Sequence, residues 1–428
     1  MEPDGSGGGL KRGKPARTHR RDQPGENVAG ARARQPCGGR RGEPKAAVGR
    51  GDGVSAAGKH IAFAVPGDVI VADGSLVQGP GHQVPPCRHF PLCGGCQLQH
   101  LTDAAYADYV ASRVAGALAQ HGLECEIRLP HLSPPRSRRR ATLRALKAGG
   151  RVLVGFNEAG TNQIVDMREC HILRPELFAL VAPLRTLMAT LLPDRRAGEV
   201  QLTLTDQGVD VALQGVAAEG YEAAVALTDF GEAHQLARLT LDEGLGPEAR
   251  YQPVPPTITL SGTAVEFPTG AFLQATQDGE AALVAAVREA VADAPRTADL
   301  FAGIGTFALA LSGQRTVAEA ARDAVLALKA TRLVEVEHRD LYRRPYDAKE
   351  LAAFDAVVLD PPRAGAEEQV KQLAISTVPR IAYVSCNPAT FARDAARLVA
   401  GGYRLLWIQP VGQFRWSTHV ELAAAFAR

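Results

Sequence analysis

The sequence predicts an α/β protein whose C-terminal part is a doubly wound parallel sheet. Three observations favour this fold. From Ala281 onward, short apolar runs typical of buried strands alternate with Ala- and Leu-rich helical segments. A glycine-rich turn, Asp299–Ala308, joins one of these strands to a helix. Two further strands end in proline-containing turns at Asp360 and Cys386, at the edge where open α/β sheets bind their ligands.

Length and composition limit the kind of protein. The chain has 428 residues, enough for two or three domains, and its 46% hydrophobic and 22% charged residues are typical of globular proteins. No apolar run approaches the roughly 20 residues of a membrane span, and residues 1–30 lack the apolar core of a signal peptide. We therefore expect a cytoplasmic protein without a membrane partner, and no protein partner is evident.

The N-terminal region is more basic than the remainder. Residues 1–50 carry a net charge of +7 against −5 for residues 51–428, which favours an anionic partner such as nucleic acid. Residues 1–44 are rich in Gly, Arg and Pro and are predicted to form a disordered basic tail; a solvated tail without a role is the alternative. Residues 45–84 contain only short β-like runs such as Ile61–Val65, too few for an independent barrel.

Four of the seven cysteines form a spaced set. Cys87, Cys93 and Cys96 lie close together in the sequence, and Cys170 follows 74 positions after Cys96. In an apparently cytosolic chain such a set favours metal binding or catalysis over disulfides. Zinc takes four sulfurs tetrahedrally, and a 4Fe–4S cluster takes four cysteines equally well. The spacing therefore leaves both possibilities open.

The remaining elements are predicted in chain order. Residues 85–280 mix helices and strands, with helices expected over residues 103–121 and Leu177–Leu192 and a connector over Tyr251–Gly270. Strand candidates in this region are Arg151–Phe156, Val200–Thr205 and Val209–Leu213. The candidates after Ala281 are Thr297–Leu300, Arg315–Ala318, Val334–Glu337, Ala356–Leu359, Ile381–Val384 and Leu405–Gln409.

The glycine-rich turn indicates a nucleotide-type ligand. Gly303 and Gly305 allow a tight turn and close approach of the backbone to a ligand. Asp299 precedes the glycines and could hold the amino group of a methionine. Glu319 comes only 14 residues after Gly305, where a dinucleotide site expects about 20. These two carboxylates favour S-adenosylmethionine over a dinucleotide.

Two later turns carry the remaining candidate residues. Asp360 begins the stiff sequence Asp-Pro-Pro-Arg at the end of a strand, which favours a binding role, and Arg363 could pair with a phosphate or form a surface salt bridge. Cys386 ends the apolar run that starts at Ile381, just before Asn-Pro. A thiol in this position is either a nucleophile or a buried structural cysteine.

Four features together resemble one family of RNA-modifying enzymes. These features are the four-cysteine set, the Asp299–Phe307 loop, Asp-Pro-Pro-Arg at 360–363 and Ser-Cys-Asn-Pro at 385–388. The combination is similar to the bacterial RNA uracil-5-methyltransferases, specifically the 23S ribosomal RNA branch that carries an iron–sulfur cluster. The likeness runs from about Gly51 to the C-terminus.

The resemblance implies a domain plan and a set of site residues. It implies a truncated OB-like (TRAM) segment at 45–84, a central RNA-binding domain with the cluster at 85–280, and a Rossmann-like class I methyltransferase domain at 281–428. It also implies that Cys386 is the nucleophile, that Glu421 is the general base, and that the cysteines hold 4Fe–4S. The expected S-adenosylmethionine contacts are Gln274, Phe301, Thr306, Glu319, Asp340 and Asp360, beside Asp299, Gly303 and Gly305. Arg415 stands where the family more often has Pro.

The expected chemistry needs these residue types. A thiolate that adds to carbon 6 of uracil makes carbon 5 nucleophilic towards a methyl donor, and a carboxylate then removes the carbon 5 proton. The target base must leave its stack to reach the thiol, and the basic residues Arg138, Arg139, Arg140 and Arg363 are candidates for the RNA backbone. The alternatives are tRNA 5-methyluridine formation and a non-catalytic RNA-binding assembly factor.

Overall fold

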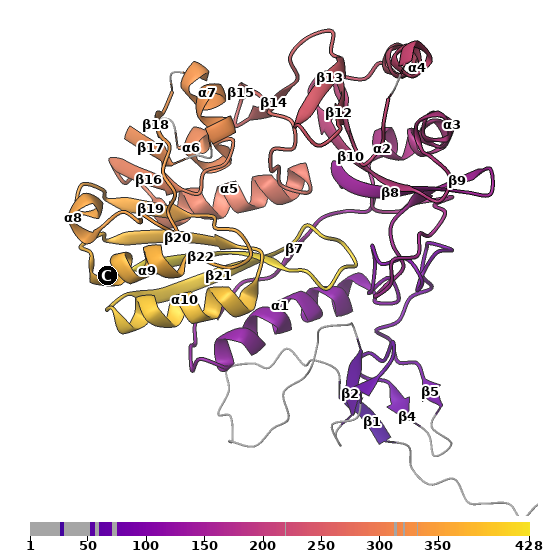
Figure 1. Cartoon of the computed structure of the whole chain (residues 1–428). Helices are drawn as coiled ribbons and strands as arrows, with labels where there is room; N and C mark the ends of the chain where they lie inside the picture. The colour runs from indigo at the N-terminus through magenta and orange to yellow at the C-terminus, as the bar shows by residue number, and fades with distance from the viewer. Residues whose placement is uncertain are drawn as a thin grey trace, which may run out of the picture.

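Four β-sheets organise the part of the chain that the computed structural model describes (Figure 1). The described residues are 26–29, 52–55, 60–70, 75–218, 220–311, 315–319, 322–331 and 333–428. A small N-terminal sheet lies at one end of the molecule, a six-stranded central sheet at another, and a nine-stranded sheet with its helices forms the largest body. A two-stranded hairpin completes the set.

The N-terminal sheet corrects one predicted boundary. Its strands, in the order β3-β2-β1-β4-β5, are β1 (Glu26–Ala29), β2 (Gly53–Ser55), β3 (His60–Ile61), β4 (Val69–Ile70) and β5 (Leu76–Val77). The strand β1 pairs with both β2 and β4, so it is central to the sheet. It falls inside the predicted tail at 1–44, so four residues of that tail are strand. The rest of the predicted tail lies outside the described residues.

The central sheet confirms the strands predicted between residues 151 and 213. Its order is β13-β12-β11-β10-β8-β9. The strands are β8 (Arg140–Ala148), β9 (Arg151–Gly155), β10 (Ala197–Thr205), β11 (Gly208–Gln214), β12 (Arg238–Asp242) and β13 (Pro247–Tyr251). The helices packed on it are α2 (Pro175–Ala179), α3 (Val181–Leu191) and α4 (Gly220–Ala233). The helix predicted over Leu177–Leu192 is therefore present as two short helices.

The nine-stranded sheet confirms the predicted doubly wound fold. Its order is β18-β17-β16-β19-β20-β22-β21-β6, and β7 also pairs with β21. The strands are β6 (Glu126–Ile127), β7 (His131–Leu132), β16 (Arg296–Leu300), β17 (Arg315–Glu319), β18 (Glu335–Glu337), β19 (Ala356–Leu359), β20 (Arg380–Ser385), β21 (Arg404–Gly412) and β22 (Glu421–Ala427). The first five in the order are parallel, whereas β22 is antiparallel to both neighbours.

Helices cover both faces of this sheet, which is why its strands β19, β20 and β22 are largely apolar. On one face, α5 (Gln277–Val291) packs against Ala356 and Val358 of β19. On the other, Val357 and Leu359 face the core that α9 and α10 share. The remaining helices of this body are α1 (Asp103–Ala119), α6 (Thr306–Ala310), α7 (Arg322–Thr331), α8 (Ala348–Leu351), α9 (Glu367–Ile375) and α10 (Pro388–Ala400).

Two segments depart from the predicted organisation. The expected connector Tyr251–Gly270 contains a hairpin, β14 (Thr257–Leu260) and β15 (Thr263–Glu266), whose apolar face packs on α6 and α7. Its turn uses two left-handed residues, Ser261 and Gly262. In addition, α1 packs on α10, and β6 and β7 extend the large sheet, so these parts of residues 85–280 contact the C-terminal sheet and its helices. None of the described helices is long and apolar enough to cross a membrane.

Candidate functional site

The carboxyl ends of three parallel strands bring the main candidate residues to one edge of the sheet. Asp299 lies in β16, Asp360 directly follows β19, and Cys386 directly follows β20. These strands are adjacent and in register. The chain order reverses between β16 and β19, and such a switch point is where open α/β sheets bind ligands.

Glu421 reaches the same edge from the opposite direction. Because β22 runs antiparallel to β20, Leu422 pairs with Ser385, and Glu421 begins its strand beside Cys386. Glu421 is only 2% exposed. Burial and the nearby Asp360 raise the pKa of the Glu421 carboxyl to about 8, although a hydrogen bond from Gln413 opposes this.

The thiol and Asp360 share the same electrostatic environment. Cys386 is half-buried, and burial, followed by the negative charges of Glu421 and Asp360, raises the pKa of its thiol to about 11. Arg363 acts in the other direction. Burial alone raises the pKa of Asp360 to about 7. This edge therefore holds three acidic groups whose raised pKa values favour the protonated forms.

A chain of two glutamines connects the two carboxylates. The Gln274 amide donates to Asp360 over 3.4 Å, and Gln413 Nε2 donates to Gln274 Oε1 over 2.7 Å. Gln413 Oε1 in turn accepts from the backbone amide of Ala275 at 2.9 Å. Gln413 was missed by the sequence analysis. The available signal was a polar amide placed directly after a buried strand.

The glycine-rich loop has the shape that a close ligand requires. Gly305 adopts φ +91°, and a side chain there would meet Leu328 at 2.3 Å. Gly303 adopts φ +56°, but a Cβ built on it would meet nothing within 4 Å. The backbone at Gly303 therefore borders open space, while Thr306 begins α6 behind it. Phe301, at φ +64°, is the strained residue that turns the chain out of β16.

Asp340 is exposed and shapes a turn beside this loop. Its carboxylate accepts from the amides of Tyr342 and Arg343 at 3.1 and 3.2 Å. The Tyr342 ring packs on Phe301 with centroids 5.7 Å apart, and its hydroxyl donates to the carbonyl of Gly365 at 3.2 Å. Tyr342, which the sequence analysis did not single out, thus joins the loops that follow β16 and β19. For Glu319 the structure describes only the backbone, at the end of β17.

The four candidate arginines divide into different environments. Arg139 is buried and forms an ion pair with Glu280 at 2.5 Å, so its guanidinium already has a partner inside the protein. Its Nε also donates to the carbonyl of Gln274. Arg140 lies over the exposed ring of Phe272, and Arg363 is exposed at the sheet edge. Arg138 lies over the Phe414 ring at 5.5 Å.

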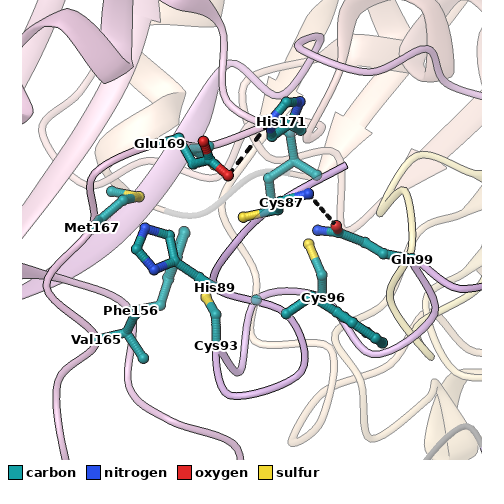
Figure 2. A pocket seen from close by; sticks show the side chains of 14 residues that line it. Cys87, His89, Cys93, Cys96, Gln99, Phe156, Val165, Met167, Glu169 and His171 are labelled. Carbon is teal, nitrogen blue, oxygen red and sulfur yellow. Dashed lines mark hydrogen bonds and ion pairs between the residues drawn. The ribbon is translucent and has the colours of Figure 1, made fainter. Parts of the chain in front are cut away.

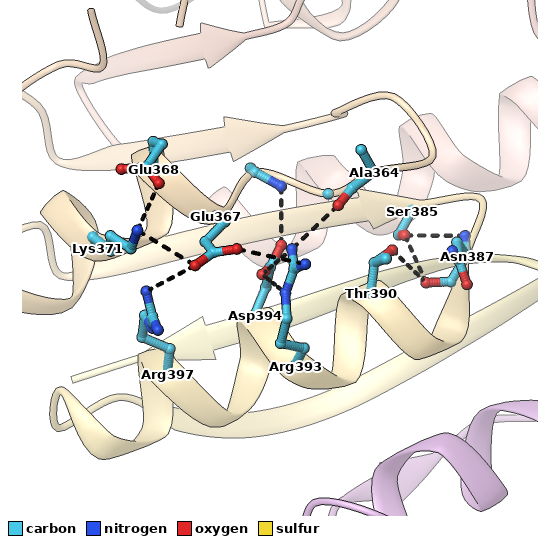
Figure 3. Close-up of polar contacts among 12 residues, drawn as sticks. Ala364, Glu367, Glu368, Lys371, Ser385, Asn387, Thr390, Arg393, Asp394 and Arg397 are labelled. Atoms are coloured by element: carbon cyan, nitrogen blue, oxygen red, sulfur yellow. Dashed lines mark hydrogen bonds and ion pairs between the residues drawn. The ribbon is translucent and has the colours of Figure 1, made fainter. Parts of the chain in front are cut away.

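The loop that carries Asp360 and Arg363 is tied to α10, the helix that follows Cys386 (Figure 3). Asn387 and Thr390 both donate to the carbonyl of Arg363 at 3.2 Å. The buried carboxylate of Asp394 accepts from the backbone amide of Ala366 at 2.9 Å. These contacts fix the Asp-Pro-Pro-Arg turn relative to the thiol.

The four spaced cysteines meet around one cavity. All four are free thiols, and they line the cavity together with residues that include His89, Met167 and Glu169 (Figure 2). Burial, with smaller effects of the neighbouring thiols, raises the pKa of Cys93 to about 11 and that of Cys96 to about 12. Within the described residues, no three His, Cys, Asp or Glu side chains are placed to hold a single metal ion.

Comparisons with known proteins identify relatives along most of the chain. A family model described as tRNA (uracil-5-)-methyltransferase matches residues 335–428. An uncharacterized RNA methyltransferase of Zymomonas mobilis is 47% identical over 387 residues, covering 89% of this chain and 98% of that protein. The 23S rRNA (uracil(1939)-C(5))-methyltransferase RlmD of Chromohalobacter salexigens is 34% identical over 371 residues, covering 81% of this chain and 76% of RlmD.

A solved structure confirms the fold. The tRNA (uracil-54, C5)-methyltransferase of Pyrococcus abyssi, in complex with S-adenosyl-L-homocysteine, superposes with a TM-score of 0.67 at 23% identity. The match covers 88% of this chain and 97% of the archaeal enzyme. Together with the sequence relatives, it shows that the chain belongs to the RNA (uracil-5-)-methyltransferase family.

Proposed function

We propose that this methyltransferase modifies carbon 5 of one uridine in 23S ribosomal RNA through a covalent bond between Cys386 and the base. The observation that carries the proposal is the meeting of Cys386, Glu421 and Asp360 at one edge of the sheet. A thiol and a buried carboxylate with a raised pKa, side by side, are what addition to uracil and later proton removal require.

Each residue has a defined part in this reaction. The Cys386 thiol first releases its proton to solvent, and the thiolate bonds to carbon 6 of uracil. The electron pair of the 5,6 double bond moves towards the carbon 4 carbonyl, which makes carbon 5 nucleophilic. S-adenosylmethionine, when bound, supplies the methyl group as an electrophile on a positively charged sulfur. Glu421 then takes the proton from carbon 5, the sulfur–carbon 6 bond breaks, and the double bond returns. A pKa of about 8 suits a base that acts near neutral pH.

The methyl donor is assigned to the space beside the glycine-rich loop. The open surface at Gly303, with Gly305 and Thr306 behind it, leaves room for a ligand against the backbone. Asp360 and Gln274 face the catalytic pair. The further residues assigned to this site are Asp299, Phe301, Glu319 and Asp340.

The four thiols are assigned to a 4Fe–4S cluster. The donor set fits, because four free cysteines and no disulfide among the described residues line one cavity. Zinc also takes four sulfurs, and the cluster is preferred because the sequence resembles the iron–sulfur branch of the family.

Ribosomal RNA is favoured over tRNA by the sequence relatives. RlmD of Chromohalobacter salexigens, which acts on 23S rRNA, is 34% identical, whereas the archaeal tRNA enzyme is 23% identical. The exposed Arg363 and the Arg140–Phe272 pair are the groups that we assign to the RNA. We predict that the protein is located in the cytoplasm, where ribosomal RNA is found.

The decisive experiment maps 5-methyluridine in 23S rRNA and in tRNA from cells with and without this protein. We expect one uridine in 23S rRNA to lose its methyl group and to regain it when the purified protein and S-adenosylmethionine are added. Loss of a tRNA methyl group with intact 23S rRNA would assign the enzyme to tRNA instead. Iron and sulfide analysis of protein purified without air should give about four of each per chain, and stoichiometric zinc would contradict the cluster.

A further inference from the structure

The segment between β21 and β22 precedes the proposed base and is held from several sides. We call residues 413–420 the catalytic loop. Gln413 Oε1 accepts from the backbone amides of Ala275 and Thr276, and the carbonyl of Phe414 accepts from Tyr106 of α1 at 3.1 Å. Arg415 is buried, pairs with Asp103 and donates to the carbonyl of Ser133. Arg415 thus anchors the loop to α1.

The centre of the catalytic loop is strained and depends on its partners. Trp416 adopts φ +57°, a left-handed conformation that is costly for a bulky residue. Its carbonyl accepts two hydrogen bonds, from the backbone amides of Gln97 at 2.8 Å and Leu98 at 2.9 Å. Such a conformation persists only while its surroundings impose it. These two amides are therefore part of what holds the loop in shape.

Both amides belong to the residues that directly follow Cys96. The Gln97 side chain donates back to the carbonyl of Gly94 at 2.6 Å, so the turn from Cys93 to Leu98 is one tight unit. The segment after Cys170 makes a second connection. The amide of Arg138 donates to the carbonyl of Ile172 at 2.9 Å, and its guanidinium covers the Phe414 ring.

We infer that the four-cysteine site positions the catalytic loop: ligation of Cys96 and Cys170 fixes the Gln97–Leu98 amides and Arg138, which hold Trp416 and Phe414 in place. The inference rests on the proposed function for the presence of a cluster and for the role of Glu421. In the proposed reaction, none of the four cysteines contacts the uracil base or the methyl donor. The cysteine site is then a positioning device for the loop that leads into β22, and Arg138 contributes to the loop's position instead of contacting RNA.

The test compares the intact protein, purified without air, with the same protein after iron removal under reducing conditions. Hydrogen exchange of peptides covering residues 413–421 should become faster by at least about tenfold, as expected from losing the order of two hydrogen bonds. Peptides from β10 and β11, which lack this connection, serve as the internal reference. Unchanged exchange of the catalytic loop in iron-free protein would overturn the inference.

Two variants at Gln97 test the hydrogen bond between its amide and the Trp416 carbonyl in protein that keeps its iron. Gln97→Pro removes the amide that binds Trp416, whereas Gln97→Ala keeps it and removes only the side chain. With iron content near that of the wild type, Gln97→Pro should exchange faster in the loop and form the covalent RNA adduct about tenfold more slowly. Gln97→Ala, which loses only the bond to the Gly94 carbonyl, should show a clearly smaller change in both measurements. If both variants behave alike, the amide connection is not what positions the loop.

The same measurements distinguish this inference from the proposed function. Protein that never contains iron or sulfide refutes the cluster assignment, whatever the loop does. Protein that contains the cluster but keeps a fully protected loop after iron removal refutes the positioning role alone. If Gln97→Pro fails to fold, the comparison of intact and iron-free protein still decides the question.

Discussion

Two buried carboxylates, Asp394 and Glu421, show how burial leads to different consequences in one sheet. Each is only 2% exposed. Asp394 accepts hydrogen bonds from the Tyr383 hydroxyl at 2.7 Å, the Ala366 amide at 2.9 Å and Arg393 at 2.9 Å. Glu421 has Asp360 as a close neighbour, and the hydrogen bond from Gln413 opposes the pKa rise only in part.

The difference teaches that two carboxylates of equal burial are distinguished by their partners. A carboxylate surrounded by hydrogen-bond donors fixes the chain around it. A carboxylate buried beside another acid resists ionisation, and a raised pKa of this kind is typical of functional sites. Asp394 therefore holds the Asp-Pro-Pro-Arg turn, whereas Glu421 is available for proton transfer. Four experiments test this contrast between Asp394 and Glu421.

The largest effect is expected at the thiol beside Glu421. Cys386→Ala should lower methyl transfer by at least about 10⁴-fold, because no other group in the proposed mechanism can add to carbon 6. Binding of S-adenosylhomocysteine should stay within about threefold of the wild type, since the thiol contacts the base and not the donor. Cys125→Ala, which removes another half-buried thiol, is the matched control and should retain activity. Substantial turnover by Cys386→Ala would remove this residue from the mechanism.

Glu421→Gln tests the reactive carboxylate directly. Turnover should fall by roughly 10²–10⁴-fold, the usual contribution of a general base. The methylated adduct should accumulate, because proton removal is the step that releases Cys386. A denaturing gel with labelled RNA should reveal a covalent protein–RNA species that the wild type does not accumulate. If no such species forms under saturating RNA and methyl donor, Glu421 is not the base.

Asp394→Asn tests the structural carboxylate. It weakens the hydrogen bonds to a buried group and should destabilise the fold by about 1–3 kcal/mol, measured by denaturant unfolding. No covalent adduct should accumulate, because the chemistry of Glu421 is untouched. Glu367→Gln, which changes a solvent-accessible member of the same network (Figure 3), should leave stability nearly unchanged. An adduct with Asp394→Asn would erase the distinction between the two carboxylates.

The pH dependence of stability gives a further test of the reactive carboxylate. Folding raises the pKa of Glu421 to about 8 and that of Asp360 to about 7, both above their values in an unfolded chain. The folded state therefore binds more protons between about pH 4 and pH 8, so stability decreases as the pH rises through this window. Glu421→Gln should reduce that slope by at most about 1.4 kcal/mol per pH unit. Parallel slopes for wild type and variant would show that Glu421 titrates normally.

Strands and site positions could be predicted from the sequence where the residues that determine them are neighbours in the chain. The strand Ala356–Leu359 was predicted with its observed bounds, because four apolar residues end at Asp-Pro-Pro. Cys386 and Asp360 were placed at the sheet edge for the same reason. The hairpin β14–β15 was missed because the prolines before it suggested a connector, although Ser261–Gly262 is a turn signal.

Contacts between distant parts of the chain were beyond sequence reasoning. Nothing local shows that Arg139 pairs with Glu280, so its charge was assigned to RNA. Gln413 bridges to Gln274, 139 positions away, and only the fold brings them together. The strands β6 and β7 are two residues long and carry no periodic pattern. Their place in the sheet depends on β21, which follows much later in the chain.

The position of β22 has a consequence for how the protein is made. This strand lies inside the sheet, between β20 and β21, yet it is synthesised after both of them. At about 5–20 residues per second, β6 waits on the order of tens of seconds for its neighbour β21 to emerge from the ribosome. Until β22 inserts, β20 and β21 lack their shared neighbour and Cys386 has no Glu421 beside it. In the proposed mechanism, Cys386 and Glu421 therefore come together only when β22 has entered the sheet.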